Sequence, residues 1–362
     1  MARFLQMPAP PGANLVPTLT INSAAVSSGR KTHPNKKPDF FIVGAPKSGT
    51  TALDQYLAAH PDIFMAKKEI HFFGSDLKFG RQIYRRDHAG YLAEFDDRAG
   101  QSRAGEASVW YLFSKQAAAE IKAFNPQARI IIMLREPVSM MYSLYNQFRF
   151  DGNEQLPSFE AALAAQVERS RGHLVTRRAY FVQGLVYRAT AHYTEQVRRY
   201  LKVFGRERVY VIIYDDFVAD TARTYRETLK FLGVAQDFPG NTFAPVNESM
   251  SVKSSLLRNI LNDPAIRGTA IALRPWVPKA VFAGLQKLQS QFFQLNKQPA
   301  SRSPLPQELQ LTLRREFAPE VERLSFLLGR DLTHWSKIGS SAVVPSKPAP
   351  IPPVSGNASP KI

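Results

Sequence analysis

The sequence predicts an α/β fold in which helices flank a single parallel sheet. Three features lead to this prediction. Short apolar runs alternate with longer helical patterns along the central body of the chain. The run at 129–134, RIIIML, is continuously apolar after Arg129, as expected for a strand that helices cover on both faces. The run at 40–43, FFIV, leads through a glycine turn directly into a helical pattern.

Strands and helices alternate from residue 40 onwards. The predicted strands are 40–43, 104–107, 129–134 and 209–214. The predicted helices are 50–59, 114–124, 137–150, 180–204 and 221–232, followed by a mostly helical stretch to residue 328. Pro137 suits the first turn of its helix, and Gly233 suits the end of the last one. Asp215 or Asp216 is expected to cap the segment that follows the fourth strand.

Composition divides the chain into three parts. Residues 1–37 are rich in proline, serine and alanine, and residues 339–362 are rich in proline. Both segments are predicted to be flexible tails, because such compositions do not build a packed core. Residues 38–338 form the one predicted domain.

Charge and cysteine content narrow the range of functions. The 362 residues carry a net charge of +17; residues 1–37 hold +5 and residues 337–362 hold +3, which leaves +9 on the body between them and favours anionic ligands. The chain has no cysteine, which excludes disulfides, a cysteine nucleophile and thiolate metal sites. No segment has the length of a membrane span or the pattern of a secretory signal, so we expect a cytoplasmic protein.

A glycine turn, Gly44 to Gly49, joins the first strand to its helix and continues into Thr50 and Thr51. In this context backbone N–H groups and the helix dipole bind a phosphate group. The two glycines have the spacing of a P-loop, but Thr50 stands where an ATPase has lysine, and the lysine lies earlier, at Lys47. We therefore predict a P-loop-type sheet in which residues 48–51 hold a phosphate and Lys47 approaches it from another side.

A second phosphate-binding signal follows the strand at 129–134. This strand ends in Arg135-Glu136-Pro137, and the next helix carries Ser143. An arginine at the carboxyl end of a buried parallel strand faces the ligand crevice of the sheet, and its planar guanidinium suits phosphate. The other interpretation is an arginine that pairs with Glu136 or meets solvent. The first phosphate loop makes phosphate binding the favoured interpretation.

The two segments resemble the nucleotide-binding motifs of sulfotransferases that use 3′-phosphoadenosine 5′-phosphosulfate (PAPS). Pro46-Lys47-Ser48-Gly49-Thr50-Thr51 resembles the family's 5′-phosphosulfate loop, and the strand with Arg135 and Ser143 resembles its 3′-phosphate segment. The resemblance implies that Lys47 contacts the phosphosulfate and that the amides of 48–51 hold the 5′-phosphate. It also implies that Arg135 and Ser143 hold the 3′-phosphate, and that no metal is required.

A third motif, Lys67-Lys68-Glu69-Ile70-His71-Phe72-Phe73, lies between these two. Sulfuryl transfer needs a base for the acceptor proton and a cation for the leaving phosphate. The motif resembles the K-E-x-H-F-F segment of heparan sulfate and other glycosaminoglycan sulfotransferases, in which the glutamate is the base. The resemblance implies Glu69 as the base and His71 as its helper. His71 itself is the alternative base, because histidine titrates near neutral pH.

Weaker matches extend the resemblance over about residues 38–255. They are Tyr84, Tyr91 and Phe95, the segment Gly105-Glu106-Ala107-Ser108, and Gly184 to Tyr187 near the bound nucleotide. We expect Glu106 to be structural, paired with a basic side chain. The glycosaminoglycan enzymes have a membrane anchor and usually a disulfide near the carboxyl end; we expect no such anchor here, and the sequence has no cysteine for the disulfide. The region from Asn247 to Lys253 looks more like a bacterial-type member.

The expected function is therefore sulfuryl transfer from PAPS to a hydroxyl or amine. A glycan or glycoconjugate is the first choice of acceptor; a lipid-linked sugar, a small metabolite and a peptide stay open. Arg169, Arg171, Arg177 and Arg178 form a loose cluster that either meets an anionic acceptor or is a solvated helix face.

Two other functions are compatible with parts of the sequence. A P-loop kinase or NTPase would hold Mg²⁺ on an acid at the end of a neighbouring strand, for which Asp215 and Asp216 are candidates. A basic module that binds anionic polymers fits the net charge. However, no aromatic-interleaved nucleic-acid motif stands out, so no nucleic-acid partner is expected.

Overall fold

The computed structural model describes residues 37–79, 87–175, 179–237, 243, 250–252, 297–299 and 304–337. Several predictions concern residues outside these ranges. They are the predictions on the two tails, on Tyr84, on Arg177 and Arg178, and on most of the segment from Asn247 to Lys253. The boundaries of the predicted domain therefore stay predictions.

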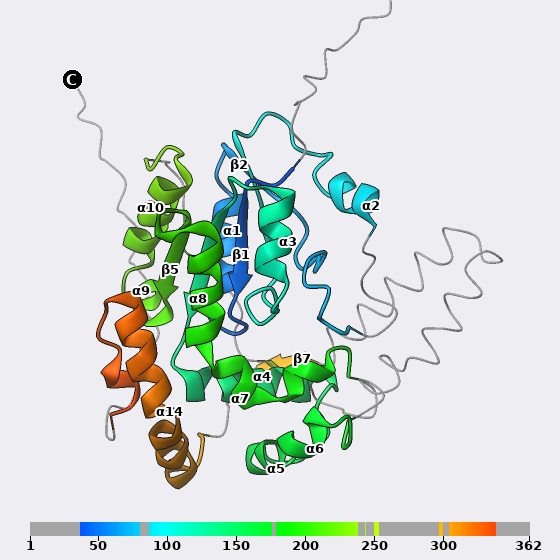
Figure 1. Cartoon of the computed structure of the whole chain (residues 1–362), viewed down its shortest axis with the longest axis vertical. Helices are drawn as coiled ribbons and strands as arrows, with labels where there is room; N and C mark the ends of the chain where they lie inside the picture. Colours follow the sequence, from blue (N-terminus) through cyan, green and yellow to red (C-terminus); the bar gives the residue numbers. More distant parts are fainter. Residues whose placement is uncertain are drawn as a thin grey trace, which may run out of the picture. The chain divides into compact units, whose positions relative to one another are not determined.

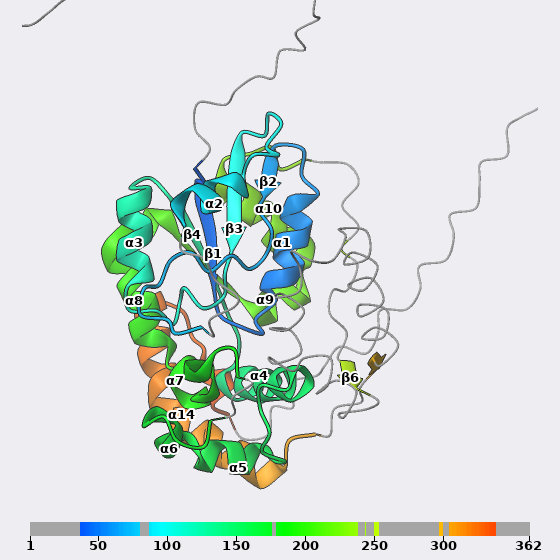
Figure 2. The same cartoon turned by 90° about the vertical axis from the view of Figure 1, so that its right-hand side faces the viewer.

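A five-stranded parallel sheet forms the centre of the fold (Figures 1 and 2). Its strands are β1 (Phe40–Gly44), β2 (Ile63–Met65), β3 (Arg103–Ala107), β4 (Arg129–Leu134) and β5 (Val209–Ile213). Their order across the sheet is β2-β3-β1-β4-β5, and every adjacent pair is parallel. A short antiparallel pair, β6 (Met250–Val252) with β7 (Lys297–Pro299), stands apart from this sheet.

The strand order places one switch point beside β1. The chain fills one side of β1 with β2 and β3, and then crosses to the other side with β4 and β5. Connections that leave two neighbouring strands in opposite directions open a crevice at the carboxyl ends of those strands. The crevice between β1 and β4 is therefore the expected ligand site, and both predicted phosphate-binding segments begin there.

Helices cover both faces of the sheet because the strands are apolar on both. Phe40 and Ile42 of β1 belong to the core on the side of α1 (Thr50–Ala58), α9 (Tyr214–Ala219) and α10 (Thr221–Leu232). Phe41 and Val43 belong to the core on the side of α3 (Ala117–Phe124) and α8 (Tyr193–Phe204). Alternate side chains of one strand thus stabilise opposite layers, and Figure 2 shows α1 and α3 on opposite sides of the strands.

A further group of helices lies beyond the carboxyl ends of the strands (Figure 1). It comprises α4 (Pro137–Asp151), α5 (Phe159–Ala164), α6 (Gln166–Ser170), the 3₁₀ turn η1 (Val182–Leu185) and α7 (Tyr187–Ala191). The remaining elements are α2 (His88–Ala93), η2 (Arg206–Arg208), α14 (Gln307–Leu328) and η4 (Thr333–Trp335). α4 starts directly after β4 because Pro137 suits a first turn and Glu136 accepts hydrogen bonds from the amides of Val138 and Ser139.

The predicted fold class is confirmed, and several element bounds are close to those expected. The strand at 129–134 and the helix at 221–232 have the predicted bounds, and Gly233 ends the latter in a left-handed conformation. The short strand β2 and the helices α2, α5 and α6 were not predicted. Asp215 and Asp216 lie within the first turn of α9, and the cap of α10 is Asp220.

The predicted long helix at 180–204 is wrong. The segment forms η1, α7 and α8, with non-helical backbone at Val186 and His192. α8 begins where it does because the carboxylate of Glu320, on α14, accepts the amide hydrogen of Thr194 at 2.7 Å. A contact between residues 126 positions apart leaves no local signal in the sequence.

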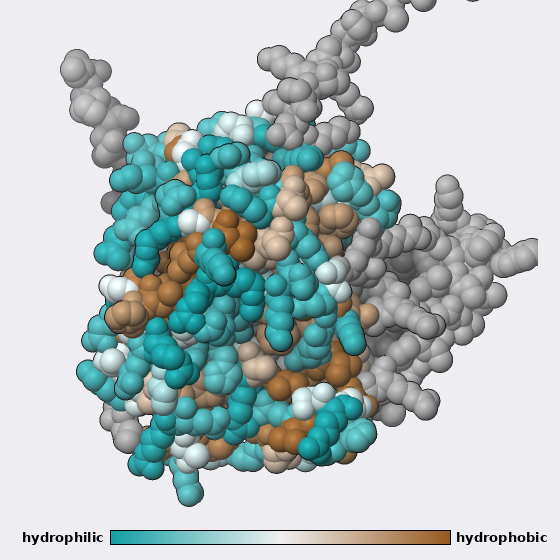
Figure 3. Space-filling model, viewed as in Figure 1, coloured by the Kyte–Doolittle hydropathy of each residue, from teal (hydrophilic) through white to brown (hydrophobic). Residues whose placement is uncertain are grey.

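The surface seen in Figure 3 is mostly hydrophilic, and its apolar side chains form separate groups. Among the helices of the described ranges, none is both long and apolar enough to cross a membrane.

Candidate active site

The loop after β1 has the geometry of a phosphate cradle. Lys47 and Gly49 both adopt positive φ, 60° and 91°. A Cβ atom at Gly49 would lie 3.2 Å from the Tyr214 ring and 3.3 Å from Met133, so glycine is needed there on two grounds. Gly49 precedes α1 without a side-chain cap. Within the described part of the chain, the amides of residues 48–51 donate to no protein acceptor, so they suit an external anion.

Lys47 and Arg135 meet at the carboxyl ends of β1 and β4. Arg135 donates from Nη1 to the backbone oxygen of Lys47 at 3.2 Å, and its guanidinium stacks over the ring of Tyr214 at 4.7 Å. Lys47 donates from Nζ to Oε1 of Gln147 on α4 at 3.0 Å. The two predicted phosphate ligands, which are 88 positions apart, are thus brought together. Glu136 does not pair with Arg135, because it caps α4.

Ser143 lies two helical turns after Arg135, on the buried side of α4, with 2% of its surface exposed. Its predicted contact with a 3′-phosphate stays a prediction.

Lys68 is a site residue that the sequence analysis did not single out. Its Nζ donates to the hydroxyl oxygens of Thr51 at 2.7 Å and Thr50 at 3.2 Å, on the first turn of α1. The same Nζ lies 4.0 Å from Oε1 of Glu69. Burial lowers the pKa of Lys68, and the carboxylates of Glu69 and Asp54 oppose this effect. One ammonium group therefore links the phosphate cradle to the predicted base.

Asp54 lies one turn further along α1 and supplies the other negative charge near Lys68. Burial raises the pKa of Asp54 from 3.8 to about 6, against the attraction of Lys68. Its Oδ1 is buried and has no hydrogen-bond partner among the described residues. The sequence analysis did not identify Asp54 either, because an acidic residue on the helix after a P-loop forms no distinctive sequence pattern.

Glu69 and His71, the predicted base and its helper, form a contact. Nε2 of His71 lies 2.9 Å from Oε2 of Glu69. The Glu69 side chain is 28% exposed, whereas that of His71 is fully buried and stacks on the ring of Phe79 at 4.7 Å. Glu69 is thus the member of the pair that an acceptor can reach, and His71 contacts it from the protein side.

Glu106 lies behind this pair, at the end of β3, and is completely buried. Its carboxylate accepts hydrogen bonds from three hydroxyl groups, those of Tyr91 at 2.5 Å, Tyr111 at 2.6 Å and Ser108 at 2.7 Å. Burial raises the pKa of Glu106, and the hydroxyl contacts oppose that effect. Its hydrogen-bond donors are thus hydroxyl groups and not the basic side chain that we predicted.

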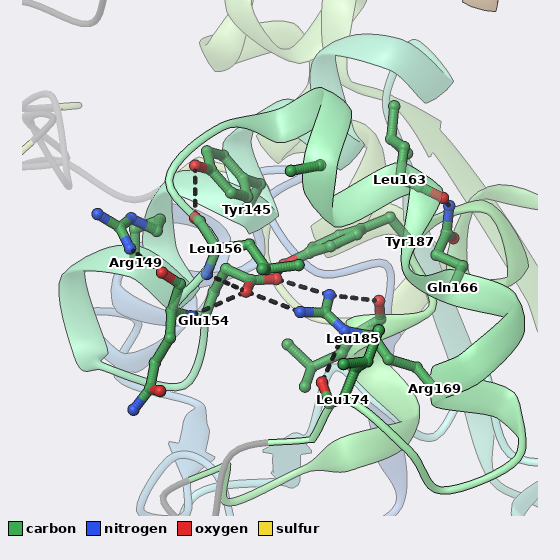
Figure 4. A network of polar contacts seen from close by, with 12 residues as sticks. Tyr145, Arg149, Glu154, Leu156, Leu163, Gln166, Arg169, Leu174, Leu185 and Tyr187 are labelled. Atoms are coloured by element: carbon green, nitrogen blue, oxygen red, sulfur yellow. Dashed lines mark hydrogen bonds and ion pairs between the residues drawn. The ribbon is translucent and has the colours of Figure 1, made fainter.

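One of the four arginines of the predicted cluster, Arg169, lies neither on an acceptor-facing surface nor on a solvated helix face. Arg169 is buried and binds the carboxylate of Glu154 through both terminal nitrogens, at 2.7 and 2.8 Å. Figure 4 shows that carboxylate between Arg169 and the hydroxyl of Tyr187. Arg171 is exposed and pairs with Glu168. The carboxylate of Glu154 thus neutralises the charge of Arg169 inside the protein, and this pair stabilises the group of helices beyond the sheet.

Asp215 and Asp216 are the candidate Mg²⁺ ligands of the kinase interpretation. Both contact the C-terminal segment, the residues that follow α14. Oδ2 of Asp215 accepts from the indole of Trp335 at 2.7 Å. Asp216 pairs with Arg330, which lowers the pKa of that carboxyl. Both acids contact the C-terminal segment, so neither supports the kinase interpretation.

Comparison with known proteins gives a consistent result. The sequence profile of the sulfotransferase domain matches residues 37–254, more than half of the chain. Human heparan sulfate glucosamine 3-O-sulfotransferase 5 is 25% identical over 199 residues, which cover 54% of this chain and 54% of that protein. Human carbohydrate sulfotransferase 15 is 26% identical over 250 residues, covering 54% and 44%. The first few curated relatives are matched over 22% to 54% of their own length.

One solved structure matches over most of both chains. The crystal structure of a sulfotransferase from Alicyclobacillus acidocaldarius aligns with a TM-score of 0.61 and 33% identity, covering 83% of this chain and 99% of that one. The chain therefore belongs to the sulfotransferase domain family. Family and fold support a sulfotransferase enzyme.

Proposed function

We propose that this protein transfers a sulfuryl group from PAPS to a hydroxyl or amine of an acceptor, with a glycan or glycoconjugate as the favoured class. The observation that carries the proposal is the position of Lys68. Its Nζ lies 2.7 Å from the Thr51 hydroxyl at the phosphate cradle and 4.0 Å from the carboxylate of Glu69. A donor phosphate and an acceptor-activating base are therefore within reach of one another.

The nucleotide would be held from two sides of the crevice. The amides of residues 48–51 suit the 5′-phosphate, because the N-terminus of α1 adds its dipole to unused N–H donors. Arg135 and Ser143 are proposed to hold the 3′-phosphate. The contact of Arg135 with the Lys47 carbonyl and the Tyr214 ring supports this role, since it fixes the guanidinium at the crevice. PAPS, when bound, supplies the activated sulfuryl group.

The residues of this chain would then move one proton and stabilise one charge. Glu69 takes the proton of the acceptor as the acceptor oxygen or nitrogen bonds to sulfur. The bond between sulfur and the 5′-phosphate oxygen breaks, and its electron pair stays on the phosphate, which leaves as part of adenosine 3′,5′-bisphosphate. Lys47, with Lys68 beside it, stabilises the negative charge that develops on that phosphate oxygen.

Glu69 is preferred over His71 as the base because of exposure. Glu69 is partly exposed at the crevice, whereas His71 is fully buried behind it. A base must come within hydrogen-bond reach of the acceptor, and the buried imidazole does not meet that requirement without displacement of Glu69. His71 is therefore assigned the role of holding the Glu69 carboxylate in place.

The test is transfer of radiolabelled sulfate from [³⁵S]PAPS to a panel of acceptors without added metal. The panel contains a desulfated uronic-acid glycan, a neutral glycan, an amino sugar and a phenol. The proposal expects label in an acceptor, and a loss of at least about 100-fold in Glu69→Gln. His71→Asn should retain more activity than Glu69→Gln. Absence of label in every acceptor, together with no binding of adenosine 3′,5′-bisphosphate, would refute the proposal. A Glu69→Gln enzyme within a few-fold of wild type would move the base to His71.

A further inference from the structure

Glu106 is a buried carboxylate to which the proposed mechanism gives no role. It lies at the carboxyl end of β3, fully buried, in register with Phe41 of β1. Its two oxygens accept three hydrogen bonds from hydroxyls, as given above. A hydroxyl that donates its single hydrogen to a carboxylate keeps its lone pairs for other donors. Glu106 therefore decides in which direction each of these hydroxyls can accept.

Two of the three hydroxyls also accept a hydrogen bond from the segment that carries the proposed base, Glu69. The Ser108 hydroxyl accepts the amide hydrogen of His71 at 3.0 Å. The Tyr111 hydroxyl accepts the amide hydrogen of Phe73 at 3.2 Å. Two alternate amides of one segment are thus connected, each through one hydroxyl, to the same carboxylate.

The third hydroxyl makes a useful contrast. Tyr91 donates to the other oxygen of Glu106, and its ring stacks on Phe72 at 4.2 Å. Its hydroxyl hydrogen-bonds to the carboxylate and not to a backbone amide of the segment that contains His71 and Phe73. Removing this hydroxyl perturbs Glu106 without breaking either amide connection.

The backbone at His71 needs such support. His71 has φ 51°, in the left-handed region that non-glycine residues rarely occupy. A conformation of this kind is strained, and it persists where the surroundings hold it. With the backbone in this conformation, Nε2 of His71 lies 2.9 Å from the Glu69 carboxylate.

We propose that Glu106 is a positioning residue for the base. It orients the hydroxyls of Ser108 and Tyr111, which hold the amides of His71 and Phe73, and His71 in turn holds Glu69. The inference rests on the proposed function, because it gives Glu106 a task only if Glu69 is the base. Glu106 touches no reacting atom and acts through Glu69.

Four single variants separate positioning from folding. Glu106→Leu has a side chain of similar size but no acceptor oxygen, so the hydroxyls of Ser108 and Tyr111 both lose the group to which they donate. Ser108→Ala and Tyr111→Phe each remove one amide connection. Tyr91→Phe is the matched control, because it removes one hydrogen bond to Glu106 and keeps both connections. The thermal midpoint and the affinity for adenosine 3′,5′-bisphosphate are measured for each, to establish that the nucleotide site is folded.

The expected result is a change in kcat without a change in nucleotide binding. Glu106→Leu, Ser108→Ala and Tyr111→Phe should lower kcat with [³⁵S]PAPS by about 10- to 100-fold, the range typical of lost supporting contacts. Tyr91→Phe should stay within about threefold of wild type. The bisphosphate Kd should change by less than about threefold in all four.

A double variant tests whether Glu106 acts through Glu69. If it does, Glu106→Leu should lower the rate of a Glu69→Gln enzyme by less than about threefold, since the positioned group is already gone. Multiplication of the two losses would overturn the positioning role, and so would full activity of Ser108→Ala and Tyr111→Phe. These two variants decide the matter if Glu106→Leu does not fold. Failure of the wild-type chain to transfer sulfate would overturn the proposed function itself, which is a separate outcome.

Discussion

We predict that the ionised carboxylate of Asp54 destabilises the folded protein above pH 6. The variant Asp54→Asn should therefore be more stable than wild type in that pH range. Burial raises the pKa of its carboxyl from 3.8 to about 6. An acid whose pKa is raised on folding is harder to ionise in the folded state than in the unfolded chain. Folding therefore costs extra free energy wherever the unfolded carboxyl is ionised, which begins near pH 4 and is complete above pH 6.

The size of the effect follows from the pKa values. A difference of roughly 2 in pKa, at about 1.4 kcal/mol for each unit, corresponds to about 3 kcal/mol. This cost already includes the attraction of Lys68, which opposes it. Asp54→Asn should thus be more stable than wild type by up to about 3 kcal/mol at pH 8, and the difference should vanish near pH 4.

The assay is urea denaturation of both proteins at several pH values between 4 and 8, with the difference in unfolding free energy compared at each pH. Asp97→Asn is the matched control: Asp97 is exposed, so its replacement should change stability by less than about 0.5 kcal/mol at every pH. A difference that does not depend on pH, or an Asp54→Asn protein less stable than wild type at pH 8, would refute the reasoning.

Three other variants test separate parts of the account. Lys47→Ala should lower kcat for PAPS by at least about 100-fold with little change in thermal midpoint, and near-normal turnover would remove its role at the leaving phosphate. Lys68→Met should weaken calorimetric binding of adenosine 3′,5′-bisphosphate about tenfold, whereas Lys67→Met, at an exposed neighbouring position, should not; equal effects would argue against a specific contact. Arg169→Met should lower the unfolding free energy by about 3–5 kcal/mol, because Glu154 would be left buried and charged; a loss under about 1 kcal/mol in urea denaturation would contradict this.

The sequence was informative where function depends on local chain geometry. The loop from Gly44 to Thr51 and the strand that ends at Arg135 are each continuous in sequence, so strand pattern and turn residues could predict them. The switch of strand order beside β1 then brings them together, as the parallel-sheet prediction implied. The contact between Glu69 and His71 also joins neighbours in the chain.

The residues that were missed depend on contacts across the fold. Lys68 becomes a site residue only because its segment returns to the first turn of α1, and Gln147 only because α4 lies beside Lys47. Arg169 looked like a surface charge, since nothing near it in sequence reveals that Glu154 is buried against it (Figure 4). The break in the predicted helix at 180–204 has the same origin, a cap supplied by Glu320. The expectation of a cytoplasmic enzyme stays a prediction.

The most direct test of the central claim is calorimetric titration with adenosine 3′,5′-bisphosphate without metal, in parallel with ATP and Mg²⁺. The account predicts tight binding of the bisphosphate by the wild-type chain and strong weakening in Arg135→Ala. Tight binding of ATP with Mg²⁺ and no response to the bisphosphate would contradict it.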